Sequence, residues 1–405
     1  MAGREVILHT VGIVCEYNPF HNGHLYQLNE TRRLFGTDTV TVCVMSGDFV
    51  QRGEAAVFDK FARAEAACRC GADLVVELPL PWCLSSAEGF AFGSVSLLSA
   101  LGCDTLSFGS ESADTLALRS LAAFLSGKEA QDRIHALMDA DETLSFARAR
   151  QLAAAEALGD AAALLSNPND ILAVEYLKAI ARTGAELETL AIRREGAVHD
   201  SITEGEYPSA MRLRELLRGG GDISVHIPAP AMTVFTREIQ AGRTPRRDLL
   251  ETALLSRLYR LAPKDFDDLP DAGGGAGRRL YRALWMCGSM DEIVREGSGK
   301  RYTAARMRRM LYGAALGLCA EDTKTVPPYI RVLAASEKGR AQLASLRGKT
   351  PLPVLNKSGE IKRAGLQAQK VFRLGAEAHE LYRLVCPSAG RCEPGEDWRK
   401  STVIV

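Results

Sequence analysis

Two histidines, His21 and His24, flank an Asn-Gly pair and could bind a phosphate chain. An apolar run at residues 11–15, typical of a buried strand, precedes them, and a helical pattern follows them. A turn from strand to helix offers free backbone N–H groups at the positive end of a helix dipole. Gly23 allows a ligand to approach the backbone closely. We therefore predict a phosphate site that two imidazoles meet from the same side.

The pattern H-x-G-H suits nucleotidyl transfer. In that reaction negative charge develops on the α-phosphate and on the departing pyrophosphate, and donors fixed on a rigid turn stabilise it without reorganising. The alternative is that both histidines only cap the helix or bond to a neighbouring loop. Because the pair directly follows the first strand of an α/β pattern, we favour the functional interpretation.

Three other turns carry residues suited to a ligand. Residues 46–54 combine two glycines, a carboxylate and an arginine, which fits a substrate loop or, equally, a polar loop with an internal ion pair. Gly109 would let a base or ribose lie against the backbone. Arg193 and Arg194 follow a predicted strand, and arginine holds phosphate bidentately and stays charged.

Two helix starts complete the candidate site. Residues 166–170 begin a helix for which Asn169 or Asp170 is the expected cap, so a structural role competes with a ligand role there. Ser209 is the expected N-cap of a second helix, which carries Arg214.

Strand and helix patterns alternate in the first part of the chain, which predicts a Rossmann-like parallel sheet with helices on both faces. Ligands of such sheets bind outside the carboxyl ends of the strands. The expected strands are residues 11–15, 39–45, 73–78, 105–108 and 187–192, and the expected helices are residues 24–35, 59–70 and 85–101, with helices dominating residues 112–180.

A glycine run at residues 219–221 and prolines at 228 and 230 suggest a domain boundary. We predict an ATP-binding domain at residues 1–225 and a mostly α-helical region at residues 226–405. Two basic patches of this second region are candidates for contact with an RNA backbone, or are simply solvated helix faces: Arg243, Arg246 and Arg247, and Lys300, Arg301, Arg306, Arg308 and Arg309.

The composition narrows the class of protein. The 405 residues include 50 basic and 50 acidic side chains, a balance that does not exclude nucleic acid, since binding depends on where basic residues cluster. The ten cysteines form no C-x-x-C pair, which favours a reduced, cytoplasmic protein over a disulfide scaffold or zinc site. We expect no secretory signal and no membrane span.

Five segments together resemble the bacterial tRNA(Met) cytidine acetate ligases: V-G-I-V-x-E-Y-N-P-F-H-N-G-H, M-S-G-D-F-V-Q-R-G-E, G-A-D-L-V-V-E-L-P, F-G-S-E and N-P-N-D-I-L-A-V-E-Y-L-K. The matches run in order from Val11 to about Arg214, and residues 329–333 and 338–340 are similar but less diagnostic. H-x-G-H alone would indicate only the nucleotidylyltransferase superfamily.

The resemblance implies an enzyme that activates acetate with ATP and acetylates the wobble cytidine of elongator tRNA(Met). His21, His24 and Arg214 would be the catalytic residues. No residue is assigned as a metal ligand; Mg²⁺ could accompany ATP, and whether the protein or only ATP would hold it is left open. The arginine belongs to an S-[AS]-x-x-[IV]-R element, from which this chain departs at Met211 and Leu213. The resemblance assigns ATP to these residues: Val11, Gly12, Ile13, Val14, Cys15, Glu16, Tyr17, Asn18, Pro19, Phe20, His21, Asn22, Gly23, His24, Gly109, Asn169, Arg193 and Arg194.

Two other functions fit the histidine motif. One is an adenylyltransferase that acts on a small phosphate-bearing cofactor precursor, which the long C-terminal extension disfavours. The other is a non-enzymatic RNA-binding protein on a nucleotide-binding fold, which the presence of both histidines disfavours.

Overall fold

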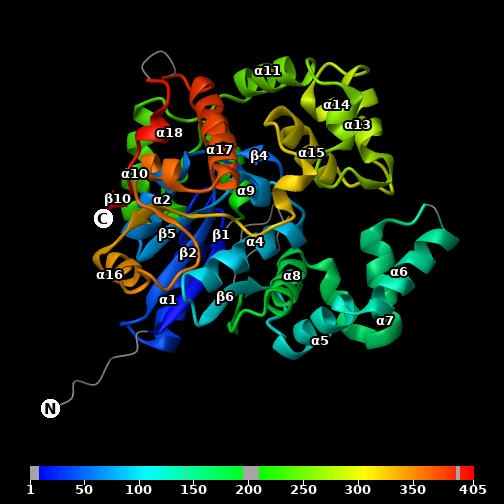
Figure 1. The fold of residues 1–405 in the computed structure, drawn as a ribbon, viewed down its shortest axis with the longest axis horizontal. Coiled ribbons are helices and arrows are strands. Elements are labelled where there is room, and N and C mark those ends of the chain that lie inside the picture. Colours follow the sequence, from blue (N-terminus) through cyan, green and yellow to red (C-terminus); the bar gives the residue numbers. More distant parts are fainter. Residues whose placement is uncertain (1–8, 142, 195–208, 389–392) are drawn as a thin grey trace.

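The computed structural model describes residues 9–141, 143–194, 209–388 and 393–405. At its centre lies a sheet of eight strands in the order β10-β8-β5-β2-β1-β6-β7, with β9 paired to β8 (Figure 1). The hairpin of β3 and β4 stands apart from this sheet. The strands are β1 (Thr10–Cys15), β2 (Val40–Ser46), β3 (Phe49–Val50), β4 (Glu54–Ala55), β5 (Leu74–Leu78), β6 (Thr105–Ser110), β7 (Glu188–Arg193), β8 (Ile330–Ala335), β9 (Val354–Leu355) and β10 (Val403–Ile404).

The five strands β5, β2, β1, β6 and β7 are all parallel, which confirms the predicted Rossmann-like sheet. The valine-rich sequences of β1, β2 and β5 suit this position because both faces of the sheet are covered by helices. The strand order reverses at β1, which has β2 on one side and β6 on the other. The crevice outside the carboxyl ends of β1 and β6 is therefore the place where this fold binds ligands.

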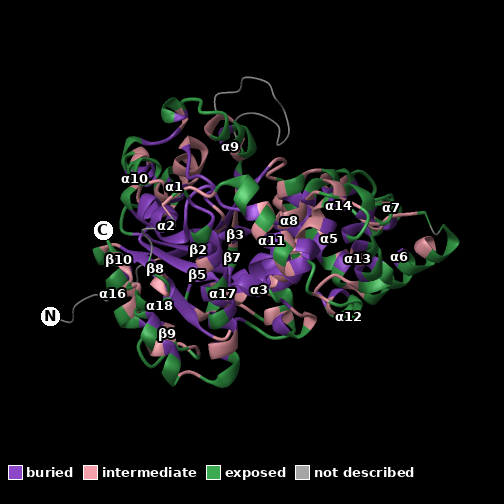
Figure 2. Ribbon diagram, turned by 90° about the horizontal axis from the view of Figure 1, so that it is seen from above, coloured by how far each residue is buried: buried purple, intermediate pink, exposed green. Residues whose placement is uncertain are grey.

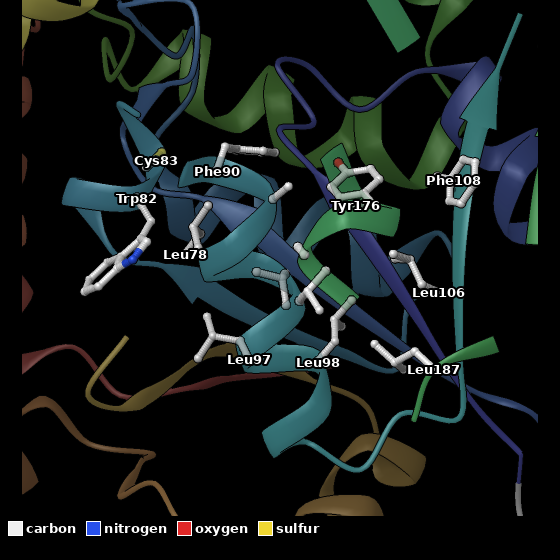
Figure 3. Close-up of a cluster of buried hydrophobic side chains, with 14 of the residues drawn as sticks. Leu78, Trp82, Cys83, Phe90, Leu97, Leu98, Leu106, Phe108, Tyr176 and Leu187 are labelled. Atoms are coloured by element: carbon white, nitrogen blue, oxygen red, sulfur yellow. The ribbon is translucent and has the colours of Figure 1, made fainter. Parts of the chain in front are cut away.

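Helices cover both faces of the sheet. The core on one face contains residues of α4 (Ala87–Ala100) and α8 (Pro168–Thr183), among them Phe90, Leu98 and Tyr176 (Figure 3). The core on the other face contains residues of α2 (Lys60–Arg69) and α10 (Ala229–Gln240), and Phe58 stacks there on Phe235. A third core lies among the helices from α11 (Arg247–Leu258) to α15 (Ala304–Ala315). Figure 2 shows that burial is concentrated around the sheet.

The helices begin and end close to the predicted positions in the first part of the chain. The short α3 and the β3–β4 hairpin were not predicted. The helices are α1 (Asn22–Phe35), α2 (Lys60–Arg69), α3 (Leu80–Cys83), α4 (Ala87–Ala100), α5 (Thr115–Ser126), α6 (Lys128–Ala140), α7 (Phe146–Leu158), α8 (Pro168–Thr183), α9 (Ala210–Arg218), α10 (Ala229–Gln240), α11 (Arg247–Leu258), α12 (Pro263–Asp267), α13 (Ala276–Leu284), α14 (Met290–Gly297), α15 (Ala304–Ala315), α16 (Glu337–Ser345), α17 (Leu366–Leu384) and α18 (Glu396–Arg399).

The last part of the chain returns to the sheet. β8 pairs antiparallel with β5, and β9 and β10 pair parallel with β8. The predicted domain boundary between residues 225 and 226 therefore separates two segments that contribute strands to one sheet. β8 covers the edge of β5, and its pairing satisfies the backbone N–H and C=O groups there. The mostly helical part of the second region spans α10 to α15.

A buried ionic cluster ties this returning segment to the loops near the sheet. The Lys60 ammonium lies 2.9 Å from Glu77 and 2.9 Å from Asp397. Arg331 contacts both carboxylates, at 3.1 Å and 2.7 Å. His379 Nδ1 lies 2.8 Å from Asp48 Oδ2. The cluster thus holds the loop after β2 against α17 and α18.

No helix within the described ranges combines the length and apolarity needed to cross a membrane. Nine of the cysteines have free thiols, and the tenth, Cys392, lies outside the described residues.

Candidate active site

The two histidines of the H-x-G-H motif stand at the start of α1. His21 is the N-cap, and its Nδ1 accepts a hydrogen bond from the Gly23 N–H at 3.1 Å. His24 Nδ1 accepts one from the His21 N–H at 3.2 Å. Their ring centroids are 3.7 Å apart. The histidines therefore do cap the helix, but among the described residues each bonds only through Nδ1, so in the neutral ring Nε2 carries the proton and can donate to a ligand.

The electrostatic environment keeps these rings neutral and favours an anion. Burial lowers the pKa of His21 to about 3, with further contributions from Arg194, His226 and Arg214. Burial and the neighbouring His21 lower the pKa of His24 well below its usual range. Both rings are therefore neutral donors at pH 7. Positive groups that depress the pKa of an imidazole would also attract a phosphate.

The loop between β1 and α1 is held from several sides. Tyr17 and Phe20 are buried and pack edge to face with centroids 4.8 Å apart, so Phe20 is a packing residue. Asn18 Oδ1 accepts from the Val57 N–H at 2.9 Å. Glu16 Oε1 accepts from the Gln51 N–H at 2.9 Å, and burial raises the pKa of Glu16. Such fixed side chains allow little movement of the histidine turn.

Arg214 reaches this loop from α9. Ser209 is the N-cap of that helix, as predicted, and accepts from the Arg212 N–H. The Arg214 guanidinium is buried, donates to the Asn18 carbonyl at 3.1 Å and pairs with Glu54 at 2.7 Å. The helix start thus places a cation beside the turn that carries the histidines.

Gly109 and Arg194 lie together on the β6 side of the crevice. A Cβ at position 109 would come within 3.3 Å of Arg194 Cγ, so the glycine makes room for the arginine stem. Arg193 is exposed and donates to the Ser112 carbonyl at 2.9 Å. Of the arginine pair, Arg194 is the one whose charge acts on His21.

The start of α8 differs from the prediction that Asn169 or Asp170 caps the helix. Asn167 is the N-cap residue, and its side chain makes no capping bond. Glu111 instead accepts from the backbone N–H groups of Asn169 and Asp170, at 3.2 and 3.0 Å. A carboxylate from the loop after β6 is thus the cap, which leaves Asp170 free to bond with Ser110.

Asn169 donates a hydrogen bond from its side-chain amide to Glu111 at 2.6 Å, so it lies beside the Gly109 turn.

The residues of β1 contribute to the site from within the core. Val11 and Ile13 are buried in the core, and a Cβ on Gly12 would come within 2.5 Å of Leu98 Cδ2. These β1 residues position the turn from within the sheet.

Three residues near the site were missed. Arg63 is completely buried and donates to the backbone carbonyls of Glu16, Ser46 and Phe58, which links the loops after β1 and β2. An arginine among the apolar residues of α2 was a usable signal. His226 lies near His21 only through the tertiary fold. Glu111 belongs to the F-G-S-E segment, but its bonds to the start of α8 are tertiary contacts that the segment does not show.

The basic patches are partly engaged within the protein. Arg243 pairs with Glu238, Arg246 with Asp248 and Arg247 with Asp291. Arg306 donates to the carbonyls of Asp271 and Gly273, and Arg309 pairs with Asp271. Contact between these patches and RNA stays a prediction.

Comparisons with known proteins identify the family of this chain. The family model described as HIGH Nucleotidyl Transferase matches residues 8–395. The tRNA(Met) cytidine acetate ligase of Caldanaerobacter subterraneus is 35% identical over 93% of this chain and 95% of its own length. That of Syntrophotalea carbinolica is 38% identical over 92% of this chain and 90% of its own length.

Two solved structures share the fold and much of the sequence. The apo crystal structure of Thermotoga maritima TmcAL has a TM-score of 0.92 and 31% identity over 98% of this chain and 100% of its own. TmcAL bound with alpha-thio ATP has a TM-score of 0.90, with the same identity and coverage. The chain therefore belongs to the HIGH nucleotidyl transferase family and, within it, to the tRNA(Met) cytidine acetate ligases.

Proposed function

We propose that this protein activates acetate with ATP to acetyl-adenylate and then acetylates the wobble cytidine of elongator tRNA(Met). The observation that carries the proposal is the neutral, closely packed pair His21 and His24, whose two Nε2 donors bond to no residue that the structure describes and lie beside Arg194 and Arg214. Relatives named for this reaction match over nearly the whole chain.

In the first step an acetate oxygen attacks the α-phosphate, and the bond between the α-phosphorus and the bridging oxygen of pyrophosphate breaks. His21 and His24 donate Nε2–H bonds to the phosphate oxygens, where negative charge grows. Arg214 and Arg194 hold the pyrophosphate or the adenylate from either side. Because the turn is fixed by capping bonds, these donors need little rearrangement in the transition state.

In the second step the exocyclic amine of cytidine attacks the acetyl carbonyl, and AMP leaves. This amine is a poor nucleophile, so holding it next to the mixed anhydride supplies much of the rate. An anticodon base is single-stranded and can be turned out into a pocket, as RNA recognition commonly requires.

We propose that Mg²⁺ accompanies ATP. Across the described ranges, no group of three or more His, Cys, Asp or Glu side chains is arranged to hold a metal. We also propose that the protein works in the cytoplasm, where its proposed substrates are present and where free thiols persist.

The test is to incubate the protein with ATP, Mg²⁺ and labelled acetate, with and without tRNA. We expect labelled acetyl-adenylate without tRNA and label on the RNA once tRNA is added. Absence of any acetate-dependent adenylate from folded protein would reject the proposed function. Label that appears on a phosphate-bearing cofactor precursor instead would favour the adenylyltransferase alternative.

A further inference from the structure

A cleft of about 730 Å³ opens where the helical region meets the nucleotide-binding part of the chain. It lies between the β3–β4 hairpin, α9, the residues before α11, and the helices α14 and α15. The residues already placed at the phosphate turn contribute little to it, with the exception of Arg214. The cleft is therefore a second space that adjoins the first.

The packing of the hairpin fixes one wall of this cleft. Gly53 has a φ of 74°, and a Cβ there would come within 2.8 Å of the Arg309 backbone nitrogen and 2.9 Å of the Arg308 carbonyl carbon. The loop thus lies directly on the backbone of α15. This contact sets the next residue, Glu54, opposite Arg308 and Tyr312, which line the same cleft.

Glu54 lies where the two spaces meet. Its carboxylate pairs with Arg214 at 2.7 Å and with Arg218 at 3.5 Å. Its side chain is 24% exposed, so it faces the cleft. A carboxylate has about four acceptor sites, and two guanidinium contacts leave capacity for a further donor.

The remaining lining suits one base of a single-stranded RNA. Tyr312 is half-buried and offers an aromatic ring on which a base can stack. Arg308 forms no ion pair with any residue that the structure describes, so it can meet a backbone phosphate. A glutamate accepts a hydrogen bond from the N4 amine of cytosine, whereas uracil presents an acceptor at that position.

We propose that this cleft receives the acceptor cytidine and that Glu54 binds its N4 amine, selecting cytosine and taking up the amine proton. The inference rests on the proposed function, since it assigns the second half-reaction to a named carboxylate. Arg214, shared by the cleft and the phosphate turn, places the amine beside the adenylate.

In the transfer step, the N4 nitrogen forms a bond to the acetyl carbon, and the bond from that carbon to the adenylate oxygen breaks. AMP leaves with the electron pair of that bond. The surplus proton of the amine passes to the Glu54 carboxylate and then to water. No oxidant or further reactant is needed.

The test compares the full-length Glu54→Gln variant with the unmodified full-length protein in both half-reactions. Glutamine keeps an oxygen that can accept from Arg214 and Arg218 but carries no charge. We expect acetate-dependent exchange of labelled pyrophosphate into ATP, measured without RNA, to stay within about threefold of the unmodified protein. Single-turnover transfer from acetyl-adenylate to a tRNA(Met) transcript should fall by roughly a hundredfold or more.

Base selection provides a second readout. The unmodified protein should bind the transcript more tightly than the same transcript with uridine at the wobble position, by roughly fivefold to a hundredfold. Glu54→Gln should bring this ratio close to one, because a glutamine amide can also donate to uridine. The matched control is Glu215→Gln, which removes a carboxylate from the same cleft. It should leave transfer and base selection unchanged.

Each outcome has a separate meaning. Equal losses in exchange and transfer for Glu54→Gln would show that the carboxylate only holds Arg214, and would overturn the inference. Unchanged transfer and an unchanged binding ratio would overturn it as well. Failure of the unmodified protein to form acetyl-adenylate or to acetylate RNA would instead reject the proposed function.

Discussion

Replacing Asp397 with asparagine should destabilise the protein strongly. Asp397 is completely buried and receives hydrogen bonds from Lys60 at 2.9 Å and from both terminal nitrogens of Arg331 at 2.8 and 2.7 Å. Burial by itself raises the pKa of Asp397, but Lys60 and Arg331 outweigh it and keep the carboxylate charged. The cluster balances three cations against three carboxylates, all buried: Lys60, Arg331, His379, Asp48, Glu77 and Asp397.

The magnitude follows from this balance. Asparagine leaves one uncompensated positive charge in a buried site, and breaking a buried pair in this way costs about 3–5 kcal/mol. The entropy of unfolding is about 2 cal/mol/K per residue, so for 405 residues a loss of about 4 kcal/mol lowers the Tm by roughly 5 °C.

Differential scanning fluorimetry or calorimetry measures this fall. In Lys60→Met/Asp397→Asn the charges balance again, so the double variant should recover much of the Tm lost by Asp397→Asn. The control is Glu393→Gln, whose exposed pair with Arg399 should shift the Tm by less than about 1 °C. A double variant that is less stable than Asp397→Asn alone would refute the reasoning.

Three further predictions concern catalysis, RNA and pH. His24→Ala should lower acetate-dependent adenylate formation by roughly 10²–10³-fold while tRNA binding persists; unchanged turnover would contradict its proposed role. The logarithm of the tRNA association constant should fall steeply and linearly with the logarithm of the salt concentration, whereas a flat response would remove the basic patches from RNA binding. Burial lowers the pKa of His379, but Asp48 and Asp397 outweigh it and raise the pKa to about 10. A raised pKa stabilises the fold fully below about pH 6.5, and this gain is lost as the pH rises toward 10. The stability difference between the unmodified protein and His379→Gln, from urea unfolding, should therefore shrink between pH 7 and 9.5; a constant difference would argue that His379 stays neutral.

Local patterns predicted the parallel half of the sheet and the histidine turn. The strands of residues 11–15 and 39–45 are short apolar runs, and each is followed by a turn or helix pattern that fixes its limits. The H-x-G-H motif could be interpreted because the residues that its chemistry requires, two histidines and a glycine, all lie within four consecutive positions. Local patterns of this kind can be interpreted without knowledge of the tertiary fold.

Contacts between distant parts of the chain could not be predicted. β9 and β10 have two residues each, too few for any periodicity, and β8 carries the buried Arg331. The cap of α8 comes from Glu111, so the sequence of residues 166–170 alone does not reveal it. Likewise, Glu54 meets Arg214 and Arg218 only in the tertiary structure, where α9 lies beside the hairpin residue.

The buried Lys60 has a consequence for synthesis on the ribosome. Its partner Asp397 lies 337 residues later in the chain. At translation rates of about 5–20 residues per second, roughly 20 to 70 s pass between the synthesis of this lysine and that of Asp397, although its other partner, Glu77, is made much earlier. Until Asp397 has been synthesised, the nascent chain cannot form the complete ionic cluster that holds the Asp48 loop. Interaction with chaperones and sensitivity to stalled translation should therefore be greatest while the last hundred or so residues are still being added.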